Sequence, residues 1–233
     1  MKRILDLFCG AGGAGMGYHR AGFEVVGVDI KPQPHYPFEF HQADALEYLA
    51  AHGREFDFIH ASPPCQKYSA MTKGRWKHRN HVDLIPETRE LLISIGKPYV
   101  IENVPGAPLI NPVMLCGSMF SLQAKCGAEL RRHRLFELSI HPVLTPSCRH
   151  GEGSAIGVYG GGQNPGRRRV IGVYGGHGRD RRRVANTQDF SVEARREAMG
   201  IDWMTGNELS QAIPPAYTEF IGKQIMTILE SKE

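Results

Sequence analysis

The order of apolar runs, turns and helical patterns between residues 3 and 104 most strongly limits the folds open to this chain. "RILDLF" (3–8) predicts a short buried strand, and the glycine-rich turn "CGAGGAGMG" leads from it into a helix near residues 15–22. The alternation continues with strands expected at 23–30, 56–61 and 97–104, and with helices at 43–53 and 81–96. Such repetition predicts an α/β fold built on a parallel, doubly wound sheet.

In such a sheet, ligands bind beyond the carboxyl ends of the strands. Five polar residues fall at or just past these ends, so we expect them around one crevice: Asp6, Asp29, Asp44, Cys65 and Glu102. A further strand is expected in "HRLFEL" (133–138), and the regular pattern stops after it.

Three segments are predicted. Residues 1–140 form a catalytic and cofactor-binding α/β domain, and residues 189–233 return to it with helical patterns at 191–200 and 217–229. Residues 141–188 form a small, irregular, basic insertion that contains a duplicated cassette. Its copies are "IGVYGGGQNPGRRRV" (156–170) and "IGVYGGHGRDRRRV" (171–184), and each "IGVYG" is expected to be β-like.

The net charge of +4 is unevenly distributed. Residues 149–183 hold eight arginines against two acidic residues, and residues 67–81 hold five lysines or arginines and no acidic residue, so the remainder is acidic. Two short basic segments on an acidic body indicate a localised binding site for a polyanion. With no apolar run long enough for a membrane span, no signal-peptide pattern and five irregularly spaced cysteines, we expect a soluble protein of a reducing compartment, without membrane contact.

The glycines at positions 10, 12 and 15 fit G-x-G-x-x-G, which lets a nucleotide-like ligand approach the backbone closely. Because Asp6 precedes the turn, a ligand with an ammonium group is favoured over one with a pyrophosphate. Asp29 is placed to accept from ribose hydroxyls and Asp44 from an adenine amino group. A helix cap or a solvated turn is an equal alternative for each.

The sequence "ASPPCQ" presents Cys65 after two prolines, which fix an extended turn. The basic segment that follows favours the thiolate, so we expect Cys65 to be a nucleophile. Glu102 ends a strand in apolar surroundings, which predicts a raised pKa and a role as hydrogen-bond donor or acid. Arg132 and Arg134 are two apart, so we expect both on one face of a strand, within reach of an anion or a base carbonyl.

Taken in order, "DLFCGAGG", "SPPCQ", "ENV", R-H-R and "ELSQAIPPAYTEFIG" resemble the signatures of the DNA cytosine-5 methyltransferase family over residues 3–136 and 189–230. The resemblance implies a Rossmann-like methyltransferase fold and methyl transfer from S-adenosylmethionine to C5 of a flipped-out cytosine in double-stranded DNA. It implies that Cys65 adds to C6, that Glu102 contacts N3 and the exocyclic amine, and that Arg134, aided by Arg132, holds the base.

The products would be 5-methylcytosine and S-adenosylhomocysteine. Matched cofactor positions are Phe8, Gly10, Ala11, Gly13, Asp29, Ile30, Asp44, Ala45, Pro64, Gln211 and Ala212. The chain departs from the family pattern at Leu130, where Gln is usual, and at Gln211, where Asn is usual. Its target-recognition region is also short, which predicts a short target site or modest selectivity.

In this family the loop after the nucleophile closes on the DNA backbone and the insertion recognises the target. The expected DNA contacts are Lys67, Ser69, Lys73, Arg75, Lys77, Arg167, Arg168, Arg169, Arg181, Arg182 and Arg183. The protein is expected to be a monomer in the cytoplasm of a bacterial or phage-infected cell, as a restriction partner or a solitary methylase.

Other classes of protein share parts of this pattern. Some relatives methylate tRNA with the same motifs, and a catalytically silent DNA-binding relative is a further possibility that Cys65 and Glu102 disfavour. An exocyclic amino-methyltransferase needs an aromatic residue where Cys65 stands, and a nicotinamide-dependent enzyme does not account for "SPPCQ" with "IENV". A zinc module of Cys116, Cys126, Cys148 and His150 lacks any CxxC pair, so no metal is expected.

Overall fold

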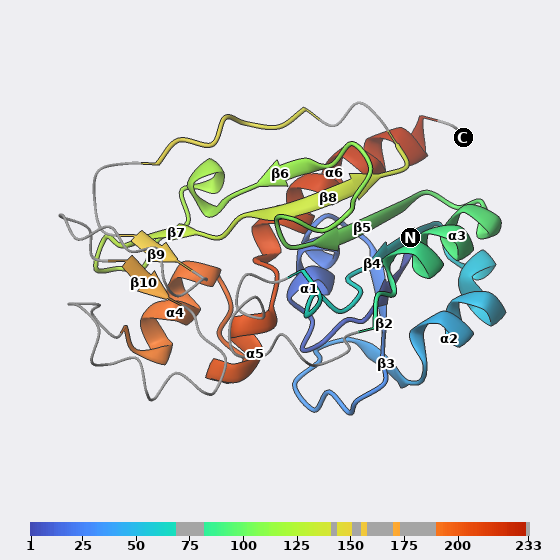
Figure 1. Ribbon diagram of the computed structural model, residues 1–233, viewed down its shortest axis with the longest axis horizontal. Helices are drawn as coiled ribbons and strands as arrows, with labels where there is room; N and C mark the ends of the chain where they lie inside the picture. Colours follow the sequence, from blue (N-terminus) through green and yellow to red (C-terminus); the bar gives the residue numbers. More distant parts are fainter. Residues whose placement is uncertain (69–81, 141–143, 151–154, 158–169, 173–189, 232–233) are drawn as a thin grey trace.

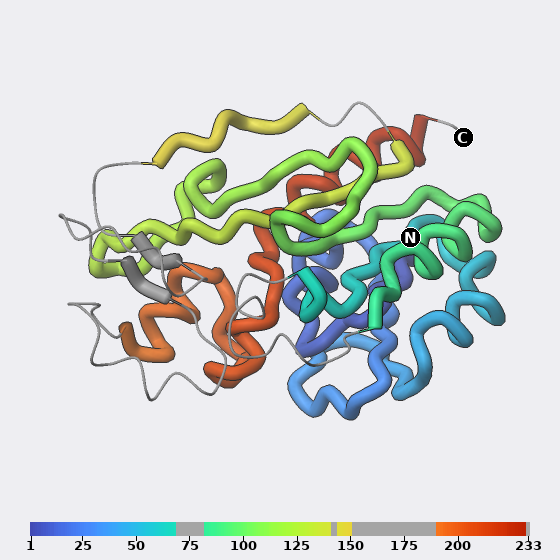
Figure 2. Tube along the Cα trace, in the orientation of Figure 1, coloured from blue at the N-terminus to red at the C-terminus, as the bar shows by residue number. Residues whose placement is uncertain are grey.

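A computed structural model describes residues 1–68, 82–140, 144–150, 155–157, 170–172 and 190–231 (Figures 1 and 2). Its centre is a seven-stranded sheet in the order β3-β2-β1-β4-β5-β8-β6. These strands are β1 (Arg3–Leu7), β2 (Glu24–Asp29), β3 (Glu39–Gln42), β4 (Phe58–Ala61), β5 (Tyr99–Asn103), β6 (Val113–Leu115) and β8 (Arg134–Leu138).

Neighbouring strands from β3 to β5 pair in parallel, whereas β8 runs antiparallel to both β5 and β6. The predicted α/β fold with a doubly wound sheet is therefore confirmed, with one reversed strand near its edge.

Helices cover both faces of this sheet. On one face lie α1 (Gly13–Arg20) and α6 (Pro215–Glu230), and on the other lie α2 (Ala45–His52) and α3 (Ile85–Ile95). Strand β1 shows how the sequence divides between them, because Ile4 joins the core under α1 and α6 while Leu5 and Leu7 join the core under α2 and α3. A strand buried on both sides is continuously apolar, as "RILDLF" predicts.

A second, three-stranded sheet has the order β10-β9-β7 and consists of β7 (Glu129–Arg131), β9 (Ala155–Gly157) and β10 (Val170–Gly172). Figure 1 shows it at one end of the molecule beside α4 (Val192–Met199), with α2 and α3 at the other end. Strands β9 and β10 begin the two cassette copies and pair in parallel, with Ile156 opposite Ile171 and Gly157 opposite Gly172. The start of each predicted β-like piece is thus confirmed, whereas residues 158–160 and 173–175 and the cassette's arginines lie outside the described residues.

The C-terminal part packs back onto the N-terminal helix. Thr218 Oγ1 donates to the carbonyl of Ala14 over 2.8 Å, and a Cβ on Gly17 would lie only 2.0 Å from Thr218 Oγ1. The close contact of α6 with α1 therefore depends on a glycine at position 17. Helix α6 thus lies against the N-terminal part of the fold, and the predicted division of the chain at 140 and 189 stays a prediction.

Two 3-10 helices, η1 (Gly53–Glu55) and η2 (Gly117–Phe120), and the short helix α5 (Gly206–Gln211) complete the described elements. Within the described ranges, no helix combines the length and apolarity that crossing a bilayer requires.

Candidate active site

The glycine turn after β1 has a left-handed backbone at several positions. Gly10 has φ +50° and Gly12, the residue before α1, has φ +85°. Phe8 adopts φ +56° although it is not glycine, which is a conformation that costs free energy and clusters at ligand-binding sites. The predicted cofactor positions Phe8 and Gly10 thus have left-handed backbone conformations, and at Phe8 the surrounding structure must offset the cost of that conformation.

The segment after α5 reaches this turn from the far end of the chain. A Cβ on Gly13 would lie 2.4 Å from the carbonyl oxygen of Ile213 and 3.2 Å from Cβ of Ala212. Trp203 Nε1 donates to the carbonyl of Ala11 over 2.9 Å. The structure therefore brings Ala212 together with the glycine turn, with Gln211 exposed at the end of α5.

The two acidic cofactor candidates both make backbone contacts. Asp29 accepts from the N–H of Gly10 and of Lys31, each over 3.0 Å, and so fixes the turn next to it. Asp44 is the N-cap of α2 and accepts from two backbone N–H groups of its first turn over 2.9 and 3.1 Å. The helix-cap alternative is confirmed for Asp44. Beside these carboxylates, Ile30 is exposed and Ala45 is buried at the start of α2.

Asp6 does not border an open crevice as expected. Its side chain is fully buried beneath Gly15, and it accepts from the Tyr36 hydroxyl over 3.2 Å. Burial raises the pKa of Asp6 to about 8, despite hydrogen bonds from Tyr36 and the Gly15 backbone. A Cβ on Gly27 would lie 2.2 Å from the Tyr36 ring, so the glycines make room for a tyrosine that sequence reasoning missed.

The loop that carries Cys65 is attached to its neighbours through the backbone. The N–H of Ser62 donates to the carbonyl of Leu7 over 3.1 Å, and the Asn103 side chain donates to the carbonyl of Pro63 over 2.9 Å. Pro63 is buried and Pro64 is partly buried. Asn103, which fixes this loop, stands in the quoted "ENV" motif but was given no role from the sequence.

Cys65 is partly buried, and its carbonyl accepts from the N–H of Tyr68 over 3.0 Å. Burial and the nearby Glu102 raise the pKa of the Cys65 thiol, and the charges of Arg134 and Arg132 offset this only in part. The expectation that the surroundings favour a thiolate is therefore wrong for the free protein, because desolvation outweighs the two guanidinium groups.

Glu102 and Arg134 form a buried ion pair, with 2.9 Å between Glu102 Oε1 and Arg134 Nε. Only 8% of the Glu102 side chain and 6% of the Arg134 side chain are exposed. Burial raises the pKa of Glu102, opposed by Arg134, Arg132 and a hydrogen bond from Ser62. The raised pKa expected at this strand end is confirmed.

Arg132 is fully buried but is anchored differently. Its Nη2 donates to the carbonyl of Ser210 in α5 over 3.1 Å, and its own carbonyl accepts from the Tyr217 hydroxyl over 2.6 Å. Because β8 begins at Arg134, Arg132 precedes the strand, and the expectation that both arginines lie on one face of a strand is wrong. Both still act on Glu102 and Cys65.

Tyr18, His60 and Ser62 form a hydrogen-bonded series that ends at the Glu102 carboxyl group. The Tyr18 hydroxyl lies 2.9 Å from His60 Nδ1, and His60 Nε2 lies 2.8 Å from Ser62 Oγ, which hydrogen-bonds Glu102. An ionised Glu102 can only accept, so Ser62 donates to it, His60 Nε2–H donates to Ser62, and Tyr18 donates to Nδ1. Burial lowers the pKa of His60 to about 3, which keeps the ring neutral. Tyr18, His60 and Ser62 were not identified from the sequence.

Of the predicted DNA contacts, the structure describes Lys67 alone. Its Nζ lies 3.2 Å from an oxygen of Asp83, which also accepts from the Tyr68 hydroxyl. The other predicted contacts lie outside the described residues: Ser69, Lys73, Arg75, Lys77, Arg167, Arg168, Arg169, Arg181, Arg182 and Arg183.

Residues 2–109, which contain the glycine turn, Cys65 and Glu102, match the model of the C-5 cytosine-specific DNA methylase family. This region of the chain is therefore similar to that family. It is 29% identical over 122 residues to the Type II methyltransferase M.AquIA of Picosynechococcus, a match that spans 45% of this chain and 49% of the relative. It is 35% identical over 121 residues to M1.HphI of Haemophilus parahaemolyticus, spanning 43% of this chain and 32% of that protein.

The matched part of the chain thus spans about half or less of these two relatives. The complete chain is similar to a crystal structure described as a DNA modification methyltransferase encoded within an E. coli prophage. The TM-score is 0.62 at 14% identity, and the match covers 99% of this chain and 100% of the other. This likeness supports the fold, which is the Rossmann-like fold of methyltransferases.

Proposed function

We propose that this protein transfers a methyl group from S-adenosylmethionine to C5 of a cytosine that has been flipped out of double-stranded DNA. The observation that carries the proposal is the convergence of Cys65, Glu102, Arg132 and Arg134. The charges of the other three groups all act on the thiol of Cys65. The site thus joins a nucleophile, a buried carboxyl group and two cations, as addition to a pyrimidine ring requires.

The glycine turn fits the methyl donor. Its backbone is left-handed at Phe8, Gly10 and Gly12, a shape that lets a ligand approach the main chain closely, and Asp29 holds the turn through the N–H of Gly10. Phe8, Gly10, Ala11, Gly13, Asp29, Ile30, Asp44, Ala45, Pro64, Gln211 and Ala212 would hold S-adenosylmethionine. When bound, it supplies an electrophilic methyl group.

Cys65 acts as the nucleophile. Because burial raises the pKa of its thiol, the thiol is protonated at the outset, and its proton passes to water as Sγ forms its bond to C6 of the cytosine. That addition breaks the C5–C6 double bond and makes C5 nucleophilic, which an unactivated cytosine ring does not offer. After methylation, water takes the proton from C5, and the electron pair of that bond re-forms the C5–C6 double bond and expels Sγ as a thiolate. N3 returns its proton to Glu102, and the thiolate takes a proton from water, which restores the ring and the thiol.

Glu102 protonates N3 as Sγ adds to C6. A carboxyl group whose pKa is raised by burial retains a proton near neutral pH more readily than an exposed one, so it suits this step. Arg134 pairs with Glu102 Oε1 at 2.9 Å and so orients the carboxyl group, while its guanidinium remains near the base carbonyl and the adduct.

The partner is double-stranded DNA in the cytoplasm of a bacterial or phage-infected cell, and the protein acts as a monomer. The match to the C-5 cytosine-specific DNA methylase model supports DNA as the partner, and the bacterial relatives support the kind of cell. Lys67 and the basic segments would contact phosphates, and the duplicated cassette would supply the target-recognition side of the DNA grip.

The test is covalent trapping on DNA that contains 5-fluorocytosine. The fluorine blocks the final elimination, so the wild-type protein should form a denaturation-resistant adduct only when S-adenosylmethionine is present. Cys65→Ala should form none, and the matched control Cys126→Ser, at an exposed cysteine, should form as much as wild type. An adduct with Cys65→Ala contradicts the mechanism.

Bisulfite sequencing of DNA from cells that express the protein identifies the product and its sequence context. Methylation of cytosines in a short context is expected. Trapping on an RNA duplex with none on DNA would reassign the substrate to RNA, and no trapping on either would reject catalysis.

A further inference from the structure

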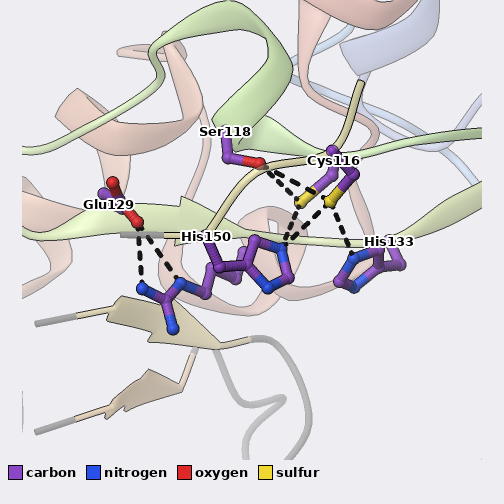
Figure 3. A network of polar contacts seen from close by, with 7 residues as sticks. Cys116, Ser118, Glu129, His133 and His150 are labelled. Atoms are coloured by element: carbon purple, nitrogen blue, oxygen red, sulfur yellow. Dashed lines mark hydrogen bonds and ion pairs between the residues drawn. The ribbon is translucent and has the colours of Figure 1, made fainter. Parts of the chain in front are cut away.

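Two cysteines and two histidines meet outside the site described above. Cys116 follows β6, His133 stands between the two arginines that precede and begin β8, and Cys148 and His150 lie in residues 144–150. Figure 3 shows the side chains of Cys116, His133 and His150 pointing toward one another. One ligand atom from each of the four residues lies within 4.8 Å of all the others.

The separations between these atoms match a tetrahedral zinc site. Zn–S bonds of about 2.3 Å and Zn–N bonds of about 2.0–2.1 Å place a sulfur and a nitrogen about 3.5 Å apart when both bind one ion. Cys116 Sγ lies 3.4 Å from His150 Nε2, while Cys148 Sγ lies 3.2 Å from His150 Nε2 and 3.5 Å from His133 Nε2.

The chemistry of the four groups agrees with this geometry. All five cysteines of the chain are free, so no disulfide occupies these sulfurs. Two thiolates and two neutral imidazoles form the Cys2His2 set that zinc takes in closed structural sites, and the charge of the ion balances the two thiolates. The Ser118 hydroxyl donates to Cys116 Sγ over 3.5 Å and lies 3.7 Å from Cys148 Sγ, so it supports the thiolate of Cys116 from outside the ligand set.

A bound ion would also fix the position of residues 144–150. These residues form neither helix nor strand, and within that segment every side chain but Cys148 is exposed. Burial of apolar surface therefore contributes little to their position. We propose that Cys116, His133, Cys148 and His150 bind one structural Zn²⁺, which attaches residues 148–150 to the turn that carries Arg132 and Arg134.

Spacing alone disfavours this site, because its ligands are 17, 15 and 2 residues apart and include no CxxC pair. The sequence-based alternative named Cys126, but that residue is exposed and outside the cluster, and His133 takes the fourth place. The expectation that no metal binds rested on the missing CxxC pair, and the convergence of the four side chains removes that basis.

Zinc content tests the proposal without reference to activity. We expect the full-length chain, purified under reducing conditions without a histidine tag, to hold about one zinc per chain by mass spectrometry. Cys148→Ser and His150→Ala, both at accessible positions, should lose the metal, and Cys126→Ser should keep it. Cys116→Ser is avoided as the main variant because Cys116 is fully buried and its loss could unfold the chain.

Cobalt substitution reports the ligand set directly. Co²⁺ in the wild-type chain should show the strong visible absorption of a tetrahedral ion and a near-ultraviolet thiolate band, which Cys148→Ser reduces and Cys126→Ser leaves unchanged. A zinc content near zero in the folded wild-type chain, or equal zinc in wild type and in both ligand variants, overturns the proposal. So does a Cys116–Cys148 disulfide in the freshly reduced protein.

Discussion

The Tyr18 hydroxyl lies 2.9 Å from His60 Nδ1, and this contact begins the buried chain that continues through Ser62 to Glu102. His60 faces the same side of the sheet as Asp6, which is its partner in the register of β1 and β4. Glu102 thus accepts a hydrogen bond from Ser62, which is itself bonded to the neutral His60 ring, and it forms an ion pair with Arg134. The carboxyl group therefore has one orientation before any base arrives.

Removing the Tyr18 hydroxyl, the first group of this hydrogen-bonded series, should weaken the fold. Tyr18→Phe leaves His60 Nδ1 buried without its donor, which costs about 1–3 kcal/mol of unfolding free energy. Urea denaturation measures the loss, and methyl transfer should fall with it because Ser62 loses its fixed orientation. Tyr48→Phe, at a partly exposed tyrosine, is the matched control and should change stability by less than about 0.5 kcal/mol. Equal stabilities for the two variants would contradict the assignment.

The contact of Asn103 with the carbonyl of Pro63 predicts a loss of activity with little loss of cofactor binding. Asn103→Asp keeps an acceptor for the N–H of Val104 but places a carboxylate oxygen against the Pro63 carbonyl. The loop that carries Cys65 should shift. A misplacement of a reacting group by about 1 Å lowers the rate by about 10- to 100-fold. Single-turnover methylation gives the rate, and calorimetry with S-adenosylhomocysteine should show unchanged affinity.

The control for this change is Asn111→Asp, in an exposed turn, which should alter neither rate nor affinity. A full rate for Asn103→Asp would show that the loop does not depend on this hydrogen bond.

Much of the fold could be predicted because its strands are short apolar runs bounded by turns. The helix α3 was predicted despite Pro86, which lies in its first turn, where a missing N–H costs nothing. Strand β3 was missed because "EFHQ" is a polar edge strand, with only one partner and half of its residues exposed. Composition carries little signal for such a strand.

The site was predicted where a residue's role depends on local sequence, as for Cys65 after two prolines. It was missed where the role depends on register between distant strands. His60 reads as part of an apolar strand, and only its place opposite Asp6 and behind Glu102 gives it a function. For Arg132, local spacing was misleading. Its distance of two residues from Arg134 predicts a shared strand, but its carbonyl accepts a hydrogen bond from the Tyr217 hydroxyl, and β8 begins only at Arg134.

Breaking the buried ion pair should cost far more than breaking one at the surface. Arg134→Met leaves Glu102 buried without its cation, and the loss should be about 3–5 kcal/mol at neutral pH. It should shrink in acid, where Glu102 becomes protonated. The control is Lys223→Met, which breaks the exposed pair with Glu219 and should cost less than about 0.5 kcal/mol. Similar losses of unfolding free energy in the two variants would mean that burial does not increase the cost of breaking the ion pair.

The buried carboxyl group of Asp6 predicts a pH dependence of stability. Its pKa is about 8 in the folded protein and 3.8 as the ordinary value, so the folded state retains a proton that the unfolded state loses. The contribution of Asp6 to stability is therefore fully present below about pH 4 and is lost progressively as the pH rises to about 8. Asp6→Asn keeps an acceptor for the Tyr36 hydroxyl but cannot ionise.

The unfolding free energy of Asp6→Asn relative to wild type should therefore rise between about pH 4 and about pH 8 and then level off. Urea denaturation across this range measures the difference, which cancels the titration of all other groups that the two chains share. Asp202→Asn, at an exposed aspartate, should give a difference that does not change with pH. A flat difference for Asp6→Asn would show that the carboxyl group ionises normally, and that water reaches the space beneath Gly15.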